Sequence, residues 1–234
     1  MKIRIGEILS DAWSLYTRHL GRLLLIALPI YAVLSIIDLV RVSFASGSEE
    51  TYLLLAFSTL LLISAAGLCW VQGAIAIAVD DLRNGKPSLS IRNLHLRVWR
   101  RATTVITAGI LAAIVTAFSA LIYFIPALLT MTVFSCLIPV IILEERNIKD
   151  AFTRSWNLVK GNFLRVLVIV IVTVAFSIFI NVVVKAILST FHDGISVYLA
   201  SVIANSFAVP FMALTWTVMY FALKLNYDFV VPDQ

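Results

Sequence analysis

Long runs of apolar residues constrain the fold of this chain more strongly than any motif in it. Six runs can be distinguished, at roughly 21–41, 52–79, 103–125, 127–143, 164–188 and 198–223. Most of them supply the ~20 apolar residues that a helix needs to cross a bilayer. Charged residues make up only 13% of the chain, against about 25% in soluble domains, so a soluble fold is excluded. The runs are continuous and do not alternate with polar residues, which excludes an outer-membrane barrel.

Basic residues are distributed unevenly among the segments between the runs. Sixteen of the 18 lysines and arginines lie in four segments, namely residues 1–22, 80–102, 144–165 and the tail from Lys224. The other two are Arg41 and Lys185. Because lysine and arginine are retained on the cytoplasmic side of a membrane, this split predicts six transmembrane helices with both termini in the cytoplasm. The segments expected to face outward are 42–51 and 189–197.

Three of the basic segments have the pattern of an amphipathic helix. In residues 151–166, AFTRSWNLVKGNFLRV, the apolar face is formed by Phe152, Trp156, Val159 and Phe163. Residues 5–19 carry a similar stripe that includes Trp13, and residues 87–101 form a weaker copy that ends near Trp99. Such helices lie in the membrane interface with the apolar face down. We therefore expect residues 147–161 and the two related segments to lie along the cytoplasmic surface, each ahead of a two-helix hairpin.

These segments also match one another in sequence. WSLYTRHLGRL at 13–23 aligns with WNLVKGNFLRV at 156–166 through shared Trp, Leu and Arg. Three units, at about 1–80, 81–143 and 144–225, predict a single polytopic membrane domain over residues 1–234. The alternative is that any cytoplasmic segment entering a membrane collects Trp and Arg without being a repeat.

Two of the amphipathic segments resemble a known family. The motifs AFTRSWNLVKGNFLRV and ILSDAWSLYTRHLGRLLLIALP, the NGKPSLS segment at 84–90 and the proline-bearing fourth run with EE at 144–145 carry the resemblance. They are similar to the membrane domain associated with glycerophosphoryl diester phosphodiesterases and to its stand-alone bacterial relatives. The resemblance covers nearly the whole chain and implies the six-span layout and a bacterial inner-membrane location. Some members carry a fused soluble barrel that hydrolyses phosphodiesters. This sequence has no such barrel, so the resemblance does not imply that activity.

No arrangement of polar residues predicts catalysis, a metal site or a cofactor. The three histidines are scattered, at His19, His95 and His192. The two cysteines lie inside apolar runs, where buried thiols are expected, at Cys69 and Cys136. Acidic residues form pairs at the ends of runs, where we expect solvated charges: Glu49–Glu50, Asp80–Asp81 and Glu144–Glu145. The sequence therefore favours a non-enzymatic protein, and no pattern in it predicts a nucleic-acid partner.

Polar residues inside the runs are few, and most have a structural explanation. Asp38 and Arg41 are three residues apart and are expected to pair near the outer interface, where Lys185 can also extend its amine to water. Hydrogen bonds between helices would account for three amides, Gln72, Asn181 and Asn205. Packing kinks would account for Pro29, Pro139 and Pro210; the alternative is the broken helices of a transporter site. No run carries a deep unpaired charge, which argues against a proton pump or a voltage sensor.

Together these features favour a multi-pass protein of the bacterial inner membrane. It would engage anionic lipid headgroups on the cytoplasmic side, or a membrane-protein partner, through its interfacial helices. The residues expected to make these contacts are Trp13, Arg18, Arg97, Trp99, Arg100, Arg101, Lys149, Arg154, Trp156 and Lys160. Two alternatives belong to other classes: a transporter or channel for a small apolar or amphipathic molecule, and an accessory subunit of a lipid-modifying enzyme. A lipid-lined cleft with arginines at its mouth would favour lipid handling, and a polar tunnel would favour transport.

Overall fold

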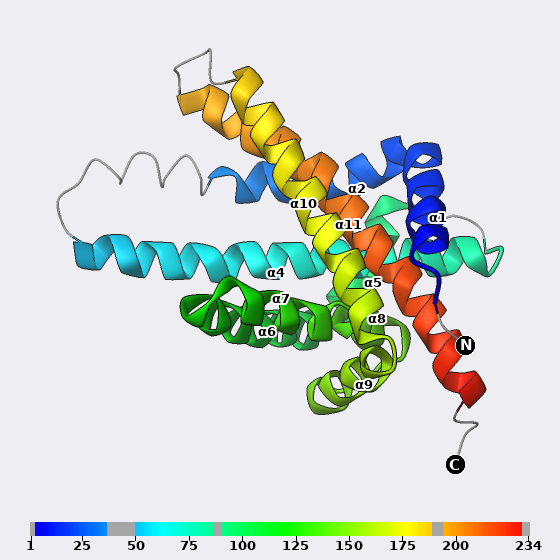
Figure 1. Cartoon of the computed structure of the whole chain (residues 1–234). Helices are drawn as coiled ribbons and strands as arrows, with labels where there is room; N and C mark the ends of the chain where they lie inside the picture. Colours follow the sequence, from blue (N-terminus) through cyan, green and yellow to red (C-terminus); the bar gives the residue numbers. More distant parts are fainter. Residues whose placement is uncertain (1–2, 37–49, 87–89, 189–193, 231–234) are drawn as a thin grey trace.

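The computed structural model describes residues 3–36, 50–86, 90–188 and 194–230, and this part of the chain is helical and contains no strand. The helices, drawn in Figure 1, are α1 (Ile5–Arg18), α2 (Leu20–Leu34), α4 (Glu50–Arg83), α5 (Ile91–Trp99), α6 (Ala102–Ile122), α7 (Phe124–Phe134), α8 (Leu137–Leu143), α9 (Ile148–Lys160), α10 (Phe163–Leu188) and α11 (Gly194–Val230).

Several of these helices have the length and composition of membrane spans. Within the described residues there are five such stretches, and a sixth if the bent pair α1 and α2 counts as one span. The five are Leu62–Arg83, Ala102–Ile122, Ile125–Leu143, Phe163–Leu188 and Tyr198–Asp228. The predicted all-helical class is therefore confirmed, and the structure has five or six long apolar helices where the sequence predicts six.

The first apolar run does not form a single long helix within the described residues. α1 and α2 meet at His19 with a bend of 82°. The 15 residues of α2 cover about 22 Å, which is less than a hydrocarbon core of about 30 Å. Residues 37–41 of the run, with the predicted Asp38–Arg41 pair, lie outside the described residues. The bend makes α1 a separate amphipathic helix, as the sequence predicts.

Helix α11 forms the centre of the bundle. It packs against α10, α4, α2, α1 and α9, and 83% of an 18-residue apolar stretch within its candidate span is buried. In Figure 1, α10 and α11 run side by side along a diagonal, and α4 crosses them. Its C-terminal half contributes large side chains that are buried in the core, among them Trp216, Met219, Tyr220 and Leu223.

Two of the long helices expose most of their surface. Within an 18-residue apolar stretch of each helix, only 17% of the residues of α6 and 22% of those of α10 are buried. The side chains that they expose are large and apolar, among them Phe118, Leu121, Ile178 and Phe179. Soluble monomers rarely expose contiguous apolar surface on this scale. Hydrocarbon chains cover it without the free-energy cost that water imposes, so the flanks of the bundle suit a lipid environment.

The fourth run is broken between α7 and α8, at Ser135 and Cys136. Pro139 causes the break, because it has no N–H to donate to the carbonyl of Ser135 four residues before it. The side chain of Gln72 on α4 donates to that carbonyl from its Nε2 at 3.3 Å. The predicted proline kink and the predicted interhelical bond of Gln72 are thus confirmed together. Asn181 differs from the prediction, because its amide donates to the carbonyl of Ser177 in its own helix.

A close approach between α4 and α6 depends on Gly109. A Cβ atom at this position would lie 2.5 Å from the Sγ of Cys69. Only glycine therefore lets the two helices pack at this distance, as small residues commonly do in membrane bundles. Cys69 and Cys136 are both buried free thiols, as the sequence predicts.

Candidate functional site

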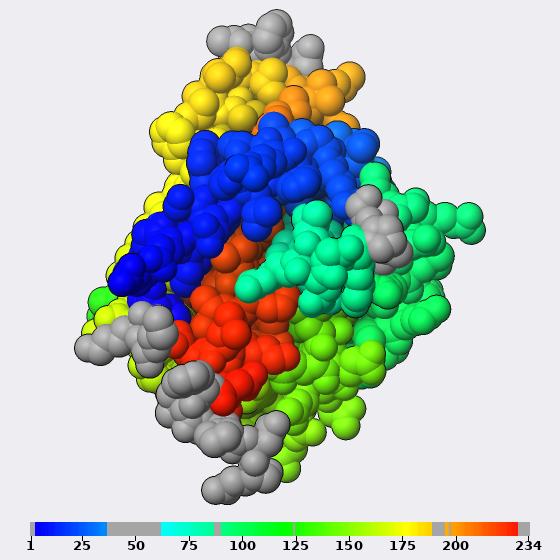
Figure 2. Space-filling model, turned by 90° about the vertical axis from the view of Figure 1, so that its right-hand side faces the viewer, coloured from blue at the N-terminus to red at the C-terminus, as the bar shows by residue number. Residues whose placement is uncertain are grey.

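Helices α1, α5 and α9 gather at one end of the bundle, which we call the basic end. Figure 2 views this end and shows the three helices arranged around the C-terminal part of α11. They correspond to the predicted amphipathic segments 5–19, 87–101 and 147–161, of which residues 87–89 lie outside the described residues. The sequence therefore predicts all three helices.

Helix α1 is fixed to α11 through one face. Its buried side chains are Ile8, Ala12 and Tyr16. The hydroxyl of Tyr16 donates to the carbonyl of Phe207 at 3.0 Å, beside Pro210, where the backbone hydrogen bonds of α11 are interrupted. Trp13 lies at the edge of this face, 51% exposed, with its ring 5.8 Å from that of Phe211. Packing thus holds α1 in place while leaving Trp13 at the surface.

Helix α5 is fixed to α4 in a similar way. Leu94 and Val98 are buried, and the indole of Trp70 donates to Nδ1 of His95 at 3.1 Å. Burial lowers the pKa of the His95 imidazole from its ordinary value of 6.5, which preserves the neutral ring that this bond requires. Trp99 is 68% exposed and is the most exposed of the three predicted tryptophan anchors.

Helix α9 contacts the bundle through Ala151, Ser155, Leu158 and Val159, which are buried. The Oγ of Ser155 donates to the carbonyl of Val133 in α7. Of the stripe predicted to face the membrane, Phe152 is half-buried against Phe134 and Trp156 is 48% exposed. The indole therefore lies at the surface of the bundle, and its contact with the membrane stays a prediction.

The seven predicted basic contacts divide into two groups. Arg97, Arg101 and Arg154 bind carboxylates of the same chain. The other four are exposed, and no ion pair involves them within the described residues: Arg18, Arg100, Lys149 and Lys160. Only this second group can offer full charges to a headgroup without first breaking an internal pair.

Glu144 is the centre of an ion cluster that the sequence does not predict. Its side chain is only 7% exposed, whereas a solvated charge was expected. Arg154 donates to it from Nε at 3.2 Å, and the hydroxyl of Tyr220 donates to it at 2.9 Å. Arg146 and Lys224 lie farther off, at 3.5 and 3.9 Å. Although partial burial opposes its charge, the Glu144 carboxylate raises the pKa of the Arg154 guanidinium.

Asp81 is a second acidic residue that was expected to be solvated and is buried. Its side chain is 2% exposed, and Nη1 of Arg97 lies 3.5 Å from its Oδ1. Its other oxygen, Oδ2, has no hydrogen-bond partner within the described residues. Asp81 lies at the end of α4, and Glu144 follows α8 directly. Through Arg97 and Arg154, these two buried carboxylates connect α5 and α9 of the basic end to the ends of α4 and α8.

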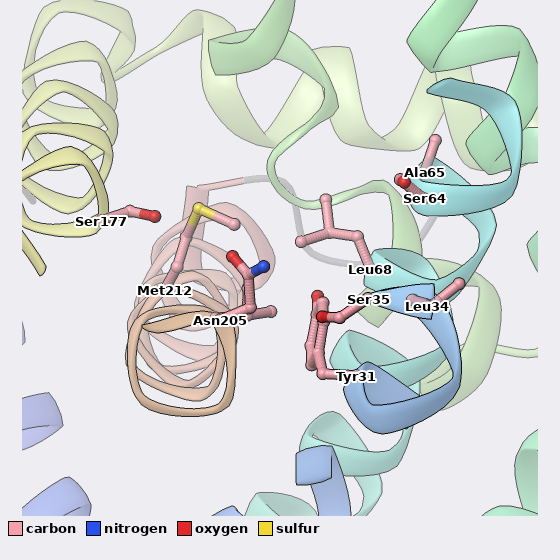
Figure 3. A pocket seen from close by; sticks show the side chains of 10 residues that line it. Tyr31, Leu34, Ser35, Ser64, Ala65, Leu68, Ser177, Asn205 and Met212 are labelled. Carbon is pink, nitrogen blue, oxygen red and sulfur yellow. The ribbon is translucent and has the colours of Figure 1, made fainter. Parts of the chain in front are cut away.

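A cavity of about 420 Å³ lies between α2, α4, α10 and α11 (Figure 3). Five polar residues line it: Tyr31, Ser35, Ser64, Ser177 and Asn205. Five apolar residues among those described also line it: Leu34, Ala65, Leu68, Val209 and Met212. The sequence predicts that Asn205 bonds to another helix. Within the described residues its amide makes no hydrogen bond, and Figure 3 shows it directed into the cavity.

A second cavity, of about 280 Å³, lies on the other side of Leu68, between α4, α6, α7, α8 and α11. Its wall is mostly apolar and rich in alanine, with Gln72 and Thr116 among its few polar side chains. Gln72 already donates to a carbonyl, so this cavity offers less hydrogen-bonding capacity than the first.

No group of three or more His, Cys, Asp or Glu side chains within the described residues could hold a metal ion. A comparison of the chain with known protein families, curated proteins and solved structures finds no match. The functional argument therefore rests on the geometry of the basic end and of the cavity.

Proposed function

We propose that this chain is a non-enzymatic multi-pass protein of the bacterial inner membrane that binds anionic lipid headgroups through its basic end. One observation carries the proposal: each of the three amphipathic helices leaves a tryptophan at the surface, Trp13, Trp99 and Trp156. Each helix also has an exposed basic residue in or next to it, as in Arg18, Arg100, Lys149 and Lys160. Tryptophan prefers the headgroup region of a bilayer, and lysine and arginine there attract anionic lipids.

The proposed topology has six spans arranged as three hairpins, with both termini in the cytoplasm. The distribution of basic residues supports it, because the basic end contains almost all of them. The bend of 82° between α1 and α2 supports an arrangement in which α1 follows the membrane surface while α2 enters the bilayer. The resemblance to the membrane domain associated with glycerophosphoryl diester phosphodiesterases is kept as a hypothesis about family and implies the same layout.

The four unpaired basic residues set the expected strength of headgroup binding. Each lysine or arginine near an anionic surface contributes about 1 kcal/mol at ordinary ionic strength, which corresponds to about a fivefold preference. Arg97, Arg101 and Arg154 contribute less, because their charges are already balanced by carboxylates. This division revises the residue set expected from the sequence.

The test is the lipid composition retained by the purified chain. The protein is extracted from a mixed phosphatidylglycerol and phosphatidylethanolamine membrane, and bound lipids are quantified by native mass spectrometry. Lys149→Gln lowers the retained share of phosphatidylglycerol, by up to about fivefold. Lys185→Gln is the matched control. It also removes the charge of an exposed lysine, but in the last turn of α10, which is not part of the basic end. Equal effects of the two substitutions would refute headgroup binding at the basic end.

Reporter fusions test the topology independently. Fusions at Gly85 and Asn147 report the cytoplasm, and fusions at Ser46 and Gly194 report the outside. An outside signal at Gly85 would overturn the proposed orientation, whatever the lipid measurements give.

A further inference from the structure

The polar side chains around the larger cavity make no hydrogen bonds within the described residues. Buried hydroxyls elsewhere in the bundle donate to backbone carbonyls, as in Thr132, Thr173, Thr215 and Thr217. Within the described residues, none of the five polar side chains that line the cavity makes a hydrogen bond: Tyr31, Ser35, Ser64, Ser177 and Asn205. Ser35 is 2% exposed and Tyr31 is 6% exposed, so these two cannot rely on bulk solvent.

An unsatisfied buried hydroxyl is costly, and the buried Oγ of Ser35 lies among four further polar side chains that make no hydrogen bond within the described residues. Each long helix could satisfy a serine hydroxyl through its own backbone, as α6 does for Ser119, which donates to the carbonyl of Val115. Ser177 does not do this, and Figure 3 shows its hydroxyl directed away from its own helix and into the cavity. The five side chains are therefore oriented toward the cavity and not toward the backbone.

The chemistry of the wall defines what would bind there. None of the described residues that line the cavity is charged, so an anionic or cationic group would receive no counter-charge from them, at a high desolvation cost. Hydroxyls and an amide bind uncharged groups that both donate and accept hydrogen bonds. The remaining wall is apolar, at Leu34, Leu68 and Met212 among others. A volume of about 420 Å³ lies in the range of small-molecule sites, about 300–1,000 Å³.

The cavity lies near the middle of the bundle. On α4 its residues Ser64 and Leu68 lie near the centre of Glu50–Arg83, and on α11 Asn205 and Val209 flank Phe207, which Tyr16 of α1 contacts. Ser64 is exposed, so the cavity can be reached from the side of the bundle. The flanks of the bundle are apolar, and a molecule that enters from there must itself partition into lipid.

We propose that this cavity binds the headgroup of an uncharged, hydroxyl-bearing lipid, such as a diacylglycerol, with its chains left among the helices and the bilayer. Tyr31, Ser35, Ser64, Ser177 and Asn205 hydrogen-bond the headgroup. The site is separate from the headgroup contacts at the basic end, and either can fail without the other.

The experiment measures binding of labelled 1,2-dioctanoylglycerol to the full-length chain in detergent micelles. Binding is saturable at one molecule per chain, and unlabelled dioctanoyl phosphatidic acid and glycerol compete poorly. Asn205→Leu, which keeps the size and removes the amide, weakens binding by about 5- to 30-fold, the loss expected for a hydrogen bond in a buried site. Asn181→Leu is the matched control: the same change, on a neighbouring helix, at an amide that does not line the cavity.

A second readout separates lost binding from lost folding. Dioctanoylglycerol raises the melting temperature of the parent chain, because a ligand that binds only the folded state stabilises it, and this increase disappears in Asn205→Leu and is reduced in Ser177→Ala. The proposal is overturned if no saturable binding occurs, which would leave water as the partner of these groups. Equal affinity of the parent chain and Asn205→Leu would also overturn it. So would displacement by phosphatidic acid or by glycerol at the same concentration as unlabelled dioctanoylglycerol.

Discussion

The neighbouring residues Glu144 and Glu145 allow one substitution to be compared in two environments. Glu144→Gln removes the negative charge from the ion cluster and keeps the shape of the side chain. Glu145→Gln makes the same chemical change one residue later, where the side chain is 75% exposed and pairs with Arg101. Glu145 has a φ of 53°, and glutamine at that position leaves this backbone strain unchanged.

The expected cost of Glu144→Gln follows from its partners. Removing one member of a buried ion pair costs about 3–5 kcal/mol, and the side chains of Glu144 and Arg154 are only 7% and 16% exposed. The amide oxygen of glutamine still accepts from Tyr220, and Arg154 keeps a contact with Asp228 at 3.3 Å, which favours the lower end of that range. Arg146 is 48% exposed, so losing its contact adds less than about 1 kcal/mol. We expect a total of about 3 kcal/mol.

The free energy of unfolding is measured on the purified full-length chain in mixed micelles, by titration with a denaturing detergent and circular dichroism. Glu144→Gln lowers it by about 3 kcal/mol, and Glu145→Gln lowers it by less than about 1 kcal/mol. In the double variant with Arg154→Gln, the two losses are not additive, because both remove the same pair. Equal losses for Glu144→Gln and Glu145→Gln, or additive losses in the double variant, would refute the reasoning.

Three further predictions concern other contacts of the bundle. Arg97→Met leaves the buried carboxylate of Asp81 without its cation and lowers the free energy of unfolding by about 3 kcal/mol; a loss under 1 kcal/mol would contradict the pairing. Because burial lowers the folded-state pKa of His95, the unfolded chain binds more protons as the pH falls below 6.5, and stability decreases there. His95→Gln removes this part of the pH dependence, and an unchanged pH profile of the melting temperature would count against it. Gly109→Ala brings a Cβ to 2.5 Å from the Sγ of Cys69 and costs about 1–3 kcal/mol. Adding Cys69→Ala restores most of that loss, and failure of this rescue would show that the contact is not the cause.

The helices could be predicted from sequence because their patterns are local. The apolar runs at 103–125 and 164–188 correspond to α6 and α10 within a few residues, because a continuous apolar run of this length indicates a helix that can span a membrane. The amphipathic helix predicted over 147–161 is α9, Ile148–Lys160. The face of α9 that contacts the bundle was not predicted, because it includes a small polar residue, Ser155, which a search for large apolar residues passes over.

The ion cluster and the cavity could not be predicted because they join residues far apart in the sequence. Glu144 has an acidic neighbour and lies at the end of an apolar run, which usually indicates a solvated charge. Its burial depends on Arg154 and Tyr220, which reach it from α9 and α11. In the same way, Asn205 alone indicates only a helix–helix bond. The structure shows a different environment for Asn205, because Tyr31 and Ser177, from two other helices, line the same cavity.

The central position of α11 has a consequence for biosynthesis. This helix follows all the other described helices along the chain, so the ribosome completes it after they have been made. Until then α2 and α10 lack the helix against which both pack, whereas α4, α6, α7 and α8 can already contact one another. A nascent chain that stops before residue 194 therefore contains a partly assembled bundle without its central helix.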